Sequence, residues 1–104
     1  MAFNGTEGEI VTLSEAAEWT ANYRETIPAG GIKGHFFGKD LLNEILDQSE
    51  CMGIRIYYGM EDDGSKNLVL VGAKADEDDM EDGVILERSV KCPPNCGQSN
   101  QLNS

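Results

Sequence analysis

The segment GIRIYYGMEDDGSKNLVLVGAK, residues 53–74, is a strand–turn–strand pattern. Apolar side chains at positions 54, 56, 58 and 60 alternate with Arg55, Tyr57 and Gly59, and a period of two indicates a half-buried β-strand. The acidic stretch that follows contains Asp63-Gly64, a dipeptide typical of tight turns with a positive φ angle. The segment therefore predicts a β-hairpin with strands over 54–60 and 67–74.

The second strand of this hairpin is apolar on both faces. Leu68 and Leu70 point to one side, and Val69, Val71 and Ala73 point to the other. Strands that are buried on both faces are usually central in their sheet. An acidic loop over 76–83 then leads to a third predicted strand, residues 84–90. The three strands together predict an antiparallel meander.

Two helices are predicted before the hairpin. Thr12 and Glu15 form a capping box, in which each side chain bonds the free backbone N–H of the other, so the first helix begins there. Apolar residues then recur at helical spacing until Pro28 ends the helix. The second helix spans residues 40–48, with an apolar stripe that includes Leu42 and Ile45.

This order of elements predicts an α+β fold in which both helices pack on one face of the three-stranded antiparallel sheet. We expect a single domain over 1–104, with a loose arm at 1–9 and a flexible tail at 98–104. The residues expected to be buried lie on the apolar stripes of the packed elements. They are Leu42, Ile45, Ile56 and Leu70.

The charge of the chain restricts its partners. Eight basic and nineteen acidic residues give a net charge of −11, which disfavours nucleic acids and anionic membranes. Basic proteins and divalent cations remain open as partners, and the acidic loop 76–82 is the candidate cation site, although no EF-hand register fits it. No apolar run is long enough for a membrane span, and the first residues do not form a secretory signal, so we expect a cytoplasmic location.

The three cysteines and the single histidine are the candidate metal or redox residues. Cys51, Cys92, Cys96 and His35 supply the four soft ligands that a structural zinc site needs, although only one close cysteine pair is present. A thioredoxin-type switch places two residues between its cysteines, whereas three separate Cys92 from Cys96. A disulfide, either between these two or from one of them to Cys51, and simple free thiols are the other interpretations. No cofactor is predicted.

Three segments carry a resemblance to a known group of proteins. IRIYYG (54–59), LVLVG (68–72) and CPPNCG (92–97) resemble a family of short, uncharacterised bacterial proteins, and the resemblance extends from about Ile32 to the C-terminus. It implies no activity. The run at 76–82 replaces the glycine-containing turn that the family would have there.

The sheet face opposite the predicted helices is the candidate interaction surface. By alternation it carries Arg55, Tyr57, Val69 and Val71, and Ile85 and Glu87 are further candidates. Exposed apolar surface rimmed by charge is typical of protein interfaces, in which Tyr and Arg are enriched. The alternative is that the N-terminal arm or the Cys-Pro-Pro segment covers this face within the same chain.

These observations favour a non-catalytic, acidic interaction module that self-associates through its exposed sheet face. The alternative is a metal-binding or thiol-redox protein that uses the Cys-Pro-Pro-Asn-Cys segment. An enzyme ranks third, because the sequence offers no general base, nucleophile or cofactor motif that can be assembled into a site.

Overall fold

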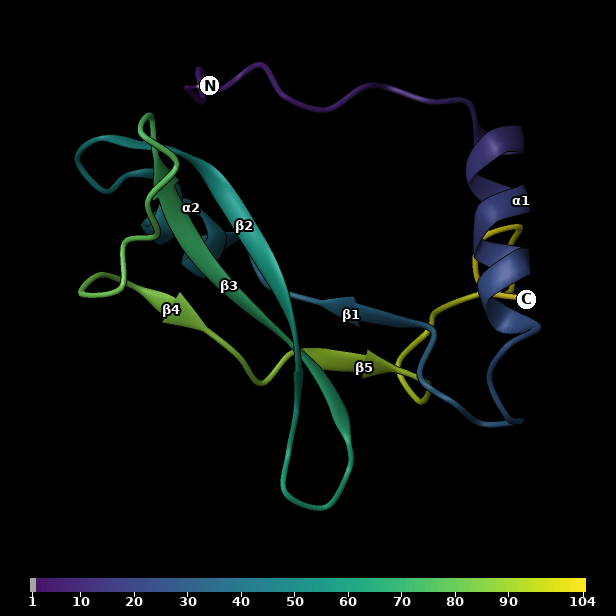
Figure 1. The fold of residues 1–104 in the computed structure, drawn as a ribbon. Helices are drawn as coiled ribbons and strands as arrows, with labels where there is room; N and C mark the ends of the chain where they lie inside the picture. Colours follow the sequence, from purple (N-terminus) through teal and green to yellow (C-terminus); the bar gives the residue numbers. More distant parts are fainter. Residues whose placement is uncertain (1) are drawn as a thin grey trace. The chain divides into compact units, whose positions relative to one another are not determined.

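A computed structural model describes residues 2–104 of the chain (Figure 1). The chain divides into two compact units. The first consists of the described part of Met1–Gly8 together with Phe37–Ser89, and the second consists of Glu9–Phe36 together with Val90–Ser104. Whether 1–104 folds as a single domain stays a prediction.

The predicted hairpin is the centre of the first unit. Strands β2 (Cys51–Met60) and β3 (Lys66–Lys74) pair antiparallel, with Ile56 opposite Leu70 and Tyr58 opposite Leu68 (Figure 1). Gly64 in the connecting turn has a φ angle of +89°, as Asp63-Gly64 predicts. The register shifts between Cys51 and Gly53, so β2 begins earlier than the regular alternation indicates.

The third strand is shorter than predicted. Only β4 (Ile85–Leu86) joins the hairpin, which gives the order β2-β3-β4 and places β3 in the centre, as predicted. Arg88 then adopts a φ angle of +64°, a conformation that does not continue a strand. After it, β5 (Val90–Cys92) pairs with β1 (Gly34–Phe36) in a separate sheet. The predicted α+β class and the three-stranded antiparallel sheet are therefore confirmed, whereas the third strand over 84–90 is wrong, because the chain turns out of this sheet at Arg88 and continues into a second, two-stranded sheet.

Helix α2 (Lys39–Leu46) covers one face of the hairpin. Ile45 is fully buried against Leu70 and Leu86, and partly buried residues surround this cluster. A helix of eight residues is only about 12 Å long, whereas the ten residues of β2 extend over about 33 Å. Ile56 is 55% exposed, so its predicted burial is wrong, and the limited length of α2 provides the physical reason.

The second unit begins with helix α1 (Leu13–Arg24), which is capped as predicted at Thr12. The Glu15 N–H donates to Thr12 Oγ1 at 3.1 Å, as the capping box predicts. The Glu15 carboxylate, however, accepts from the Thr12 hydroxyl at 3.3 Å and not from the Thr12 backbone N–H. The packing of this helix on the β2-β3-β4 sheet stays a prediction, because α1 belongs to the other unit.

The C-terminal residues form hydrogen bonds with other parts of the second unit. Arg24 Nη1 donates to the Leu102 carbonyl at 2.7 Å, and Lys33 Nζ donates to the Asn103 carbonyl at 2.5 Å. The Asn103 side chain in turn donates to the Cys96 carbonyl at 3.0 Å. The segment expected to be a flexible tail therefore has defined partners.

None of the helices formed by residues 2–104 combines the length and the apolar character that a membrane crossing requires.

Candidate functional site

The predicted interface residues lie on the hairpin face that α2 does not cover. In the β2–β3 register, Arg55 is opposite Val71 and Tyr57 is opposite Val69, so these four side chains share one face. Their exposure differs. Val71 is only 4% exposed and Val69 and Arg55 are half-buried, whereas Tyr57 is 45% exposed. Val71 is therefore buried within its own chain, and the predicted interface on this face stays a prediction.

The acidic loop after β3 binds this face through Asp79. Arg55 Nη1 donates to Asp79 Oδ1 at 2.5 Å and to the Glu77 carbonyl at 3.0 Å, and the Tyr57 hydroxyl donates to Asp79 Oδ2. Both carboxylate oxygens of Asp79 thus have a donor on β2. One carboxylate of the acidic loop, that of Asp79, is thus attached to the sheet, and cation binding by the loop stays a prediction.

These contacts shift the pKa values of all three side chains. The hydrogen bond from Tyr57, followed by the hydrogen bond and charge of Arg55, lowers the pKa of Asp79. The same bond to Asp79 raises the pKa of Tyr57, because the phenolic proton is held by the carboxylate. Hydrogen bonding to Asp79 also raises the pKa of Arg55. Together these contacts stabilise the ionised form of Asp79 and the protonated form of Tyr57.

The N-terminal arm crosses the same face. The Phe3 N–H donates to the Ala75 carbonyl at 2.8 Å, and the Phe3 ring lies 5.2 Å from the Arg55 guanidinium carbon, a cation–π contact. Glu7 accepts hydrogen bonds from the Asn4 and Gly5 N–H groups, and these backbone bonds lower its pKa. The arm therefore adopts a defined turn against the sheet. This agrees with the alternative that the N-terminal arm covers this face within the same chain.

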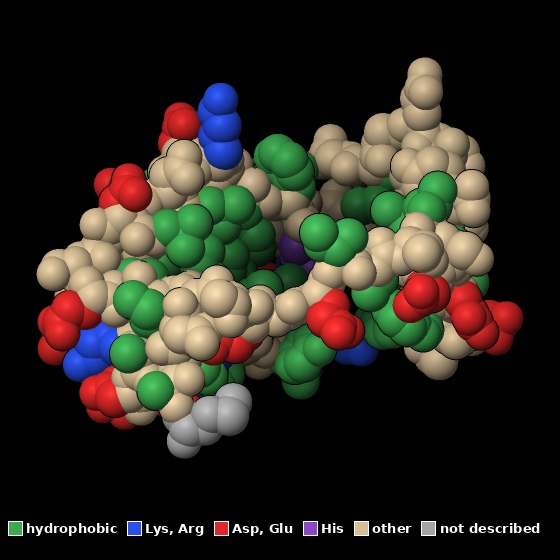
Figure 2. Space-filling model, turned by 90° about the horizontal axis from the view of Figure 1, so that it is seen from above, with side chains coloured by type: hydrophobic (Ala, Val, Ile, Leu, Met, Phe, Trp, Pro, Cys, Tyr) green, Lys and Arg blue, Asp and Glu red, His purple; other side chains and the backbone are tan. Residues whose placement is uncertain are grey.

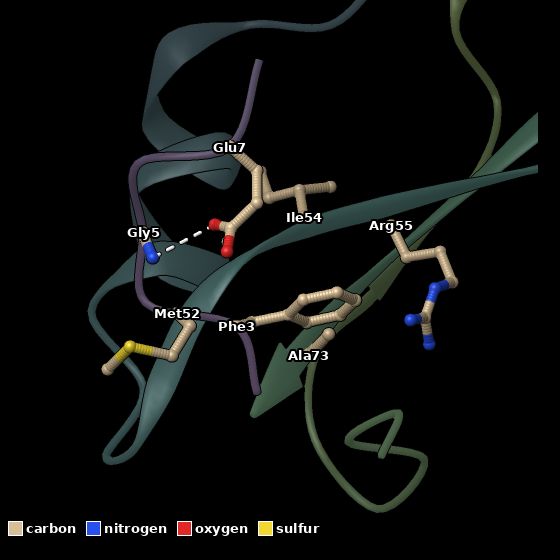
Figure 3. Close-up of a pocket in the computed structure, with 8 residues that line it drawn as sticks. Phe3, Gly5, Glu7, Met52, Ile54, Arg55 and Ala73 are labelled. Atoms are coloured by element: carbon tan, nitrogen blue, oxygen red, sulfur yellow. Dashed lines mark hydrogen bonds between the residues drawn. The ribbon is translucent and has the colours of Figure 1, made fainter. Parts of the chain in front are cut away.

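A pocket of about 320 Å³ lies between the arm and the strands (Figure 3). Phe3, Gly5 and Glu7 line it from the arm, and Met52, Ile54, Arg55 and Ala73 are among the residues that line it from the sheet. Its charged groups, Glu7 and Arg55, already have partners in the chain. The pocket therefore shows no unpaired polar group that points to a ligand.

The hairpin face on which α2 packs extends beyond the helix. There it carries apolar residues whose exposure the sequence did not predict. Ile56, Tyr58 and Met60 alternate along the end of β2 and are 55%, 92% and 70% exposed. We call these three residues the distal hairpin face. Exposed apolar side chains are not confined to this strand: on the face of the molecule drawn in Figure 2, apolar side chains lie at the surface beside Asp and Glu side chains. The alternation is visible in the sequence, but it indicates burial because the sequence does not show which part of the strand the second helix covers.

The outer edge of β2 is also open. Within residues 2–104 this strand pairs with β3 alone, and it contains no proline and no charged residue except Arg55. Proteins usually protect exposed strand edges with lysine, proline, bulges or covering segments. The register shift at Cys51/Gly53 and the arm near Met52 lie at the beginning of the strand, so the described residues of the first unit give positions 54–60 no such protection.

The cysteines and the histidine do not form a metal centre. Cys92 and Cys96 are joined in a disulfide, and the half-buried Cys51 thiol donates to the Gly53 carbonyl at 3.3 Å. His35 lies on β1 opposite Lys91, and burial, followed by the charge of Lys91, lowers its pKa. Among the described residues, no group of three or more His, Cys, Asp or Glu side chains is arranged to hold a metal ion.

No family model matches the chain, and no curated protein or solved structure is significantly similar to it. The resemblance to short bacterial proteins therefore stays a prediction.

Proposed function

We propose that this protein is a non-catalytic, acidic interaction module that binds a protein partner through the distal hairpin face. The observation that carries the proposal is the exposure of Ile56, Tyr58 and Met60 on one side of a regular strand. Removing each of these apolar side chains from water lowers the free energy of the complex, and an aromatic residue such as Tyr58 adds a large, rigid contact area.

The position of the surface on a strand supports this role. A β-strand presents its side chains in a fixed geometry, so little conformational freedom is lost when a partner binds. β3 and its turn also hold the distal hairpin face in place, since β2 and β3 pair from Cys51 to Met60. The neighbouring turn at 61–63 is acidic and provides a polar rim that would favour a basic or neutral partner surface.

A site-specific photo-cross-linking residue at position 58 tests the proposal. The variant should form an adduct of one defined mass in cells that produce the protein, because Tyr58 is 92% exposed and lies in the middle of the distal hairpin face. The matched control places the same residue at Leu41, an exposed apolar position on α2 of the same unit. If position 58 gives no adduct beyond those of position 41, the proposal is wrong.

A thiol-redox role is a second candidate, and the Cys92–Cys96 disulfide favours it. Reduction would add two electrons and two protons and give two thiols. The test is whether a defined thiol–disulfide buffer interconverts the two forms reversibly while Cys51 stays reduced. A disulfide that resists reduction until the protein unfolds would contradict this role.

A further inference from the structure

Arg24 and Lys33 both line two neighbouring pockets of the second unit. The first pocket, of about 220 Å³, is also lined by Trp19 and Tyr23, which lie about one turn apart on the same face of α1. These two aromatic residues are 54% and 45% exposed. The second pocket, of about 390 Å³, is formed mainly by the turn at 27–31. An aromatic surface and a glycine-containing turn therefore meet at two positive charges.

Neither of these cations has an anionic partner within residues 2–104. Arg24 Nη1 donates to the Leu102 carbonyl and Lys33 Nζ donates to the Asn103 carbonyl. No described carboxylate forms an ion pair with either side chain. A guanidinium has five N–H donors and an ammonium has three, so most of the donors of both groups remain free to bind a ligand. Both residues are half-buried, and partly desolvated charge is costly when no opposite charge lies near it.

The negative charge of the chain is concentrated in the other unit. The acidic side chains of the second unit are Glu9, Glu15, Glu18 and Glu25, all of them exposed, and its basic side chains are Arg24, Lys33 and Lys91. Four acidic and three basic side chains give the second unit a charge of −1, so the first unit carries −10 of the total of −11. An anion that binds to the second unit is therefore held by a nearly neutral body, and charges farther away than about 8 Å are largely screened at physiological ionic strength.

We infer that this site binds a small organic anion that joins a planar ring to a phosphate or carboxylate group. The anionic group accepts hydrogen bonds from the free donors of Arg24 and Lys33, and such charge-assisted bonds are stronger than those to neutral carbonyls. The carbonyls that the two cations contact belong to consecutive residues, whose Cα atoms are about 3.8 Å apart, so both cations can reach one anionic group. The ring packs on the aromatic surface of α1.

The site belongs to the second unit, so it goes beyond the function proposed for the distal hairpin face of the first. Pockets that hold small ligands are lined mainly by apolar and aromatic groups, with a few polar groups that fix the orientation of the ligand. Trp19, Tyr23 and Leu102 supply the first kind of surface here, and the two cations supply the second.

NMR titration tests the site. Trp19 is the only tryptophan of the chain, so its indole N–H gives a single side-chain signal in a ¹H–¹⁵N spectrum and reports directly on the first pocket. Phenyl phosphate and phenylacetate present the same ring with each of the two anionic groups. We expect at least one of them to shift this signal until it saturates, and the comparison identifies the preferred group. Phenol, which has the ring without the charge, and inorganic phosphate or acetate, which have the charge without the ring, should bind at least about tenfold more weakly.

Substitutions test the role of the two charges. Arg24→Gln and Lys33→Gln should each weaken binding at least about tenfold, whereas Arg24→Lys keeps the charge and should bind more tightly than Arg24→Gln. Lys91→Gln is the matched control, because it makes the same change in charge in the same unit but outside both pockets, and it should leave binding unchanged. Circular dichroism melting verifies that the variants are folded. In the wild type, raising NaCl from about 50 to about 500 mM should weaken binding, which tests the charge without any substitution.

Three results would each overturn the inference. The first is that neither anion shifts the Trp19 signal at concentrations up to about 10 mM. The second is that phenol binds as tightly as the anions, and the third is that Lys91→Gln weakens binding as much as Arg24→Gln and Lys33→Gln do. None of these results bears on the distal hairpin face, which the cross-linking at position 58 tests separately.

Discussion

Gln48 Oε1 accepts a hydrogen bond from the backbone N–H of Val84 at 2.8 Å, which connects the end of α2 to the start of β4. The amide of the same side chain donates to the Ile45 carbonyl at 3.0 Å, so a single half-buried glutamine satisfies backbone groups of two separate segments. These segments flank Ile45 and Leu86 of the core.

Replacing Gln48 should therefore destabilise the first unit. Gln48→Ala leaves the Val84 N–H without its acceptor, and we expect a loss of about 1–2 kcal/mol in the free energy of unfolding. Urea denaturation measures this value. Asn43→Ala, at an exposed position of α2, is the control, and equal stability of the two variants would contradict the assigned role of Gln48.

Gly83 should be coupled to the same side chain. A Cβ atom at this position would lie 2.2 Å from Gln48 Oε1, so Gly83→Ala forces the glutamine to move and should cost about 1–3 kcal/mol. In the Gln48→Ala background the obstacle is absent and the cost should largely disappear. A double-mutant cycle measures the coupling, and strict additivity of the two substitutions would show that the contact is not the cause.

Leu70 and Ile56, although opposite one another in the hairpin, should respond differently to truncation. Leu70 is 3% exposed and belongs to the core cluster, so Leu70→Ala should cost about 2–5 kcal/mol. Ile56 is 55% exposed, so Ile56→Ala should cost less than about 1.5 kcal/mol when measured at a concentration where the protein is monomeric. Thermal or urea unfolding measures the loss in the free energy of unfolding for each variant. Equal losses would place Ile56 in the core.

Stability should depend on pH through Asp79. Because its folded-state pKa is lowered below the ordinary value of 3.8, the unfolded chain binds this proton more readily, and the stabilisation is present above that value. It is lost as the pH falls through the folded-state pKa. Asp79→Asn should therefore reduce the acid sensitivity of unfolding, although Glu7, whose pKa is also lowered, retains part of it.

Asp62→Asn in the hairpin turn makes the same change in charge and is the control for the Asp79 variant. The titration of the Asp79 carboxyl by NMR gives the pKa directly. A midpoint at or above the ordinary aspartate value would contradict the contacts with Arg55 and Tyr57.

The disulfide should contribute little to the fold as a whole. It closes a loop of only five residues, so the chain-entropy model gives about 2 kcal/mol at most, and Cys96→Ser should remain folded. Without reductant we expect one reactive thiol, that of Cys51, and no stoichiometric zinc. Thiol titration and metal analysis measure both, and one zinc per chain that is lost in Cys92→Ser would overturn this prediction.

The local elements could be predicted from the sequence because each depends on neighbouring residues. The cap at Thr12, the positive φ angle at Gly64 and the common face of Ile56 and Leu70 follow from hydrogen bonds and alternation within a few residues. The alternation on β3 likewise identified it as the central strand, because Leu70 and Val71 on its two faces both had to be buried.

The hairpin, the two faces of its strands and the start of α1 therefore follow from the sequence alone, whereas the packing of distant segments sets which side chains are covered. The short reach of α2 leaves Ile56 and Tyr58 exposed on one face. On the other face, Phe3 and Asp79 contact Arg55, which the alternation alone placed on the predicted interaction surface. Burial depends on segments distant in sequence, and no local pattern shows which part of the sheet they cover.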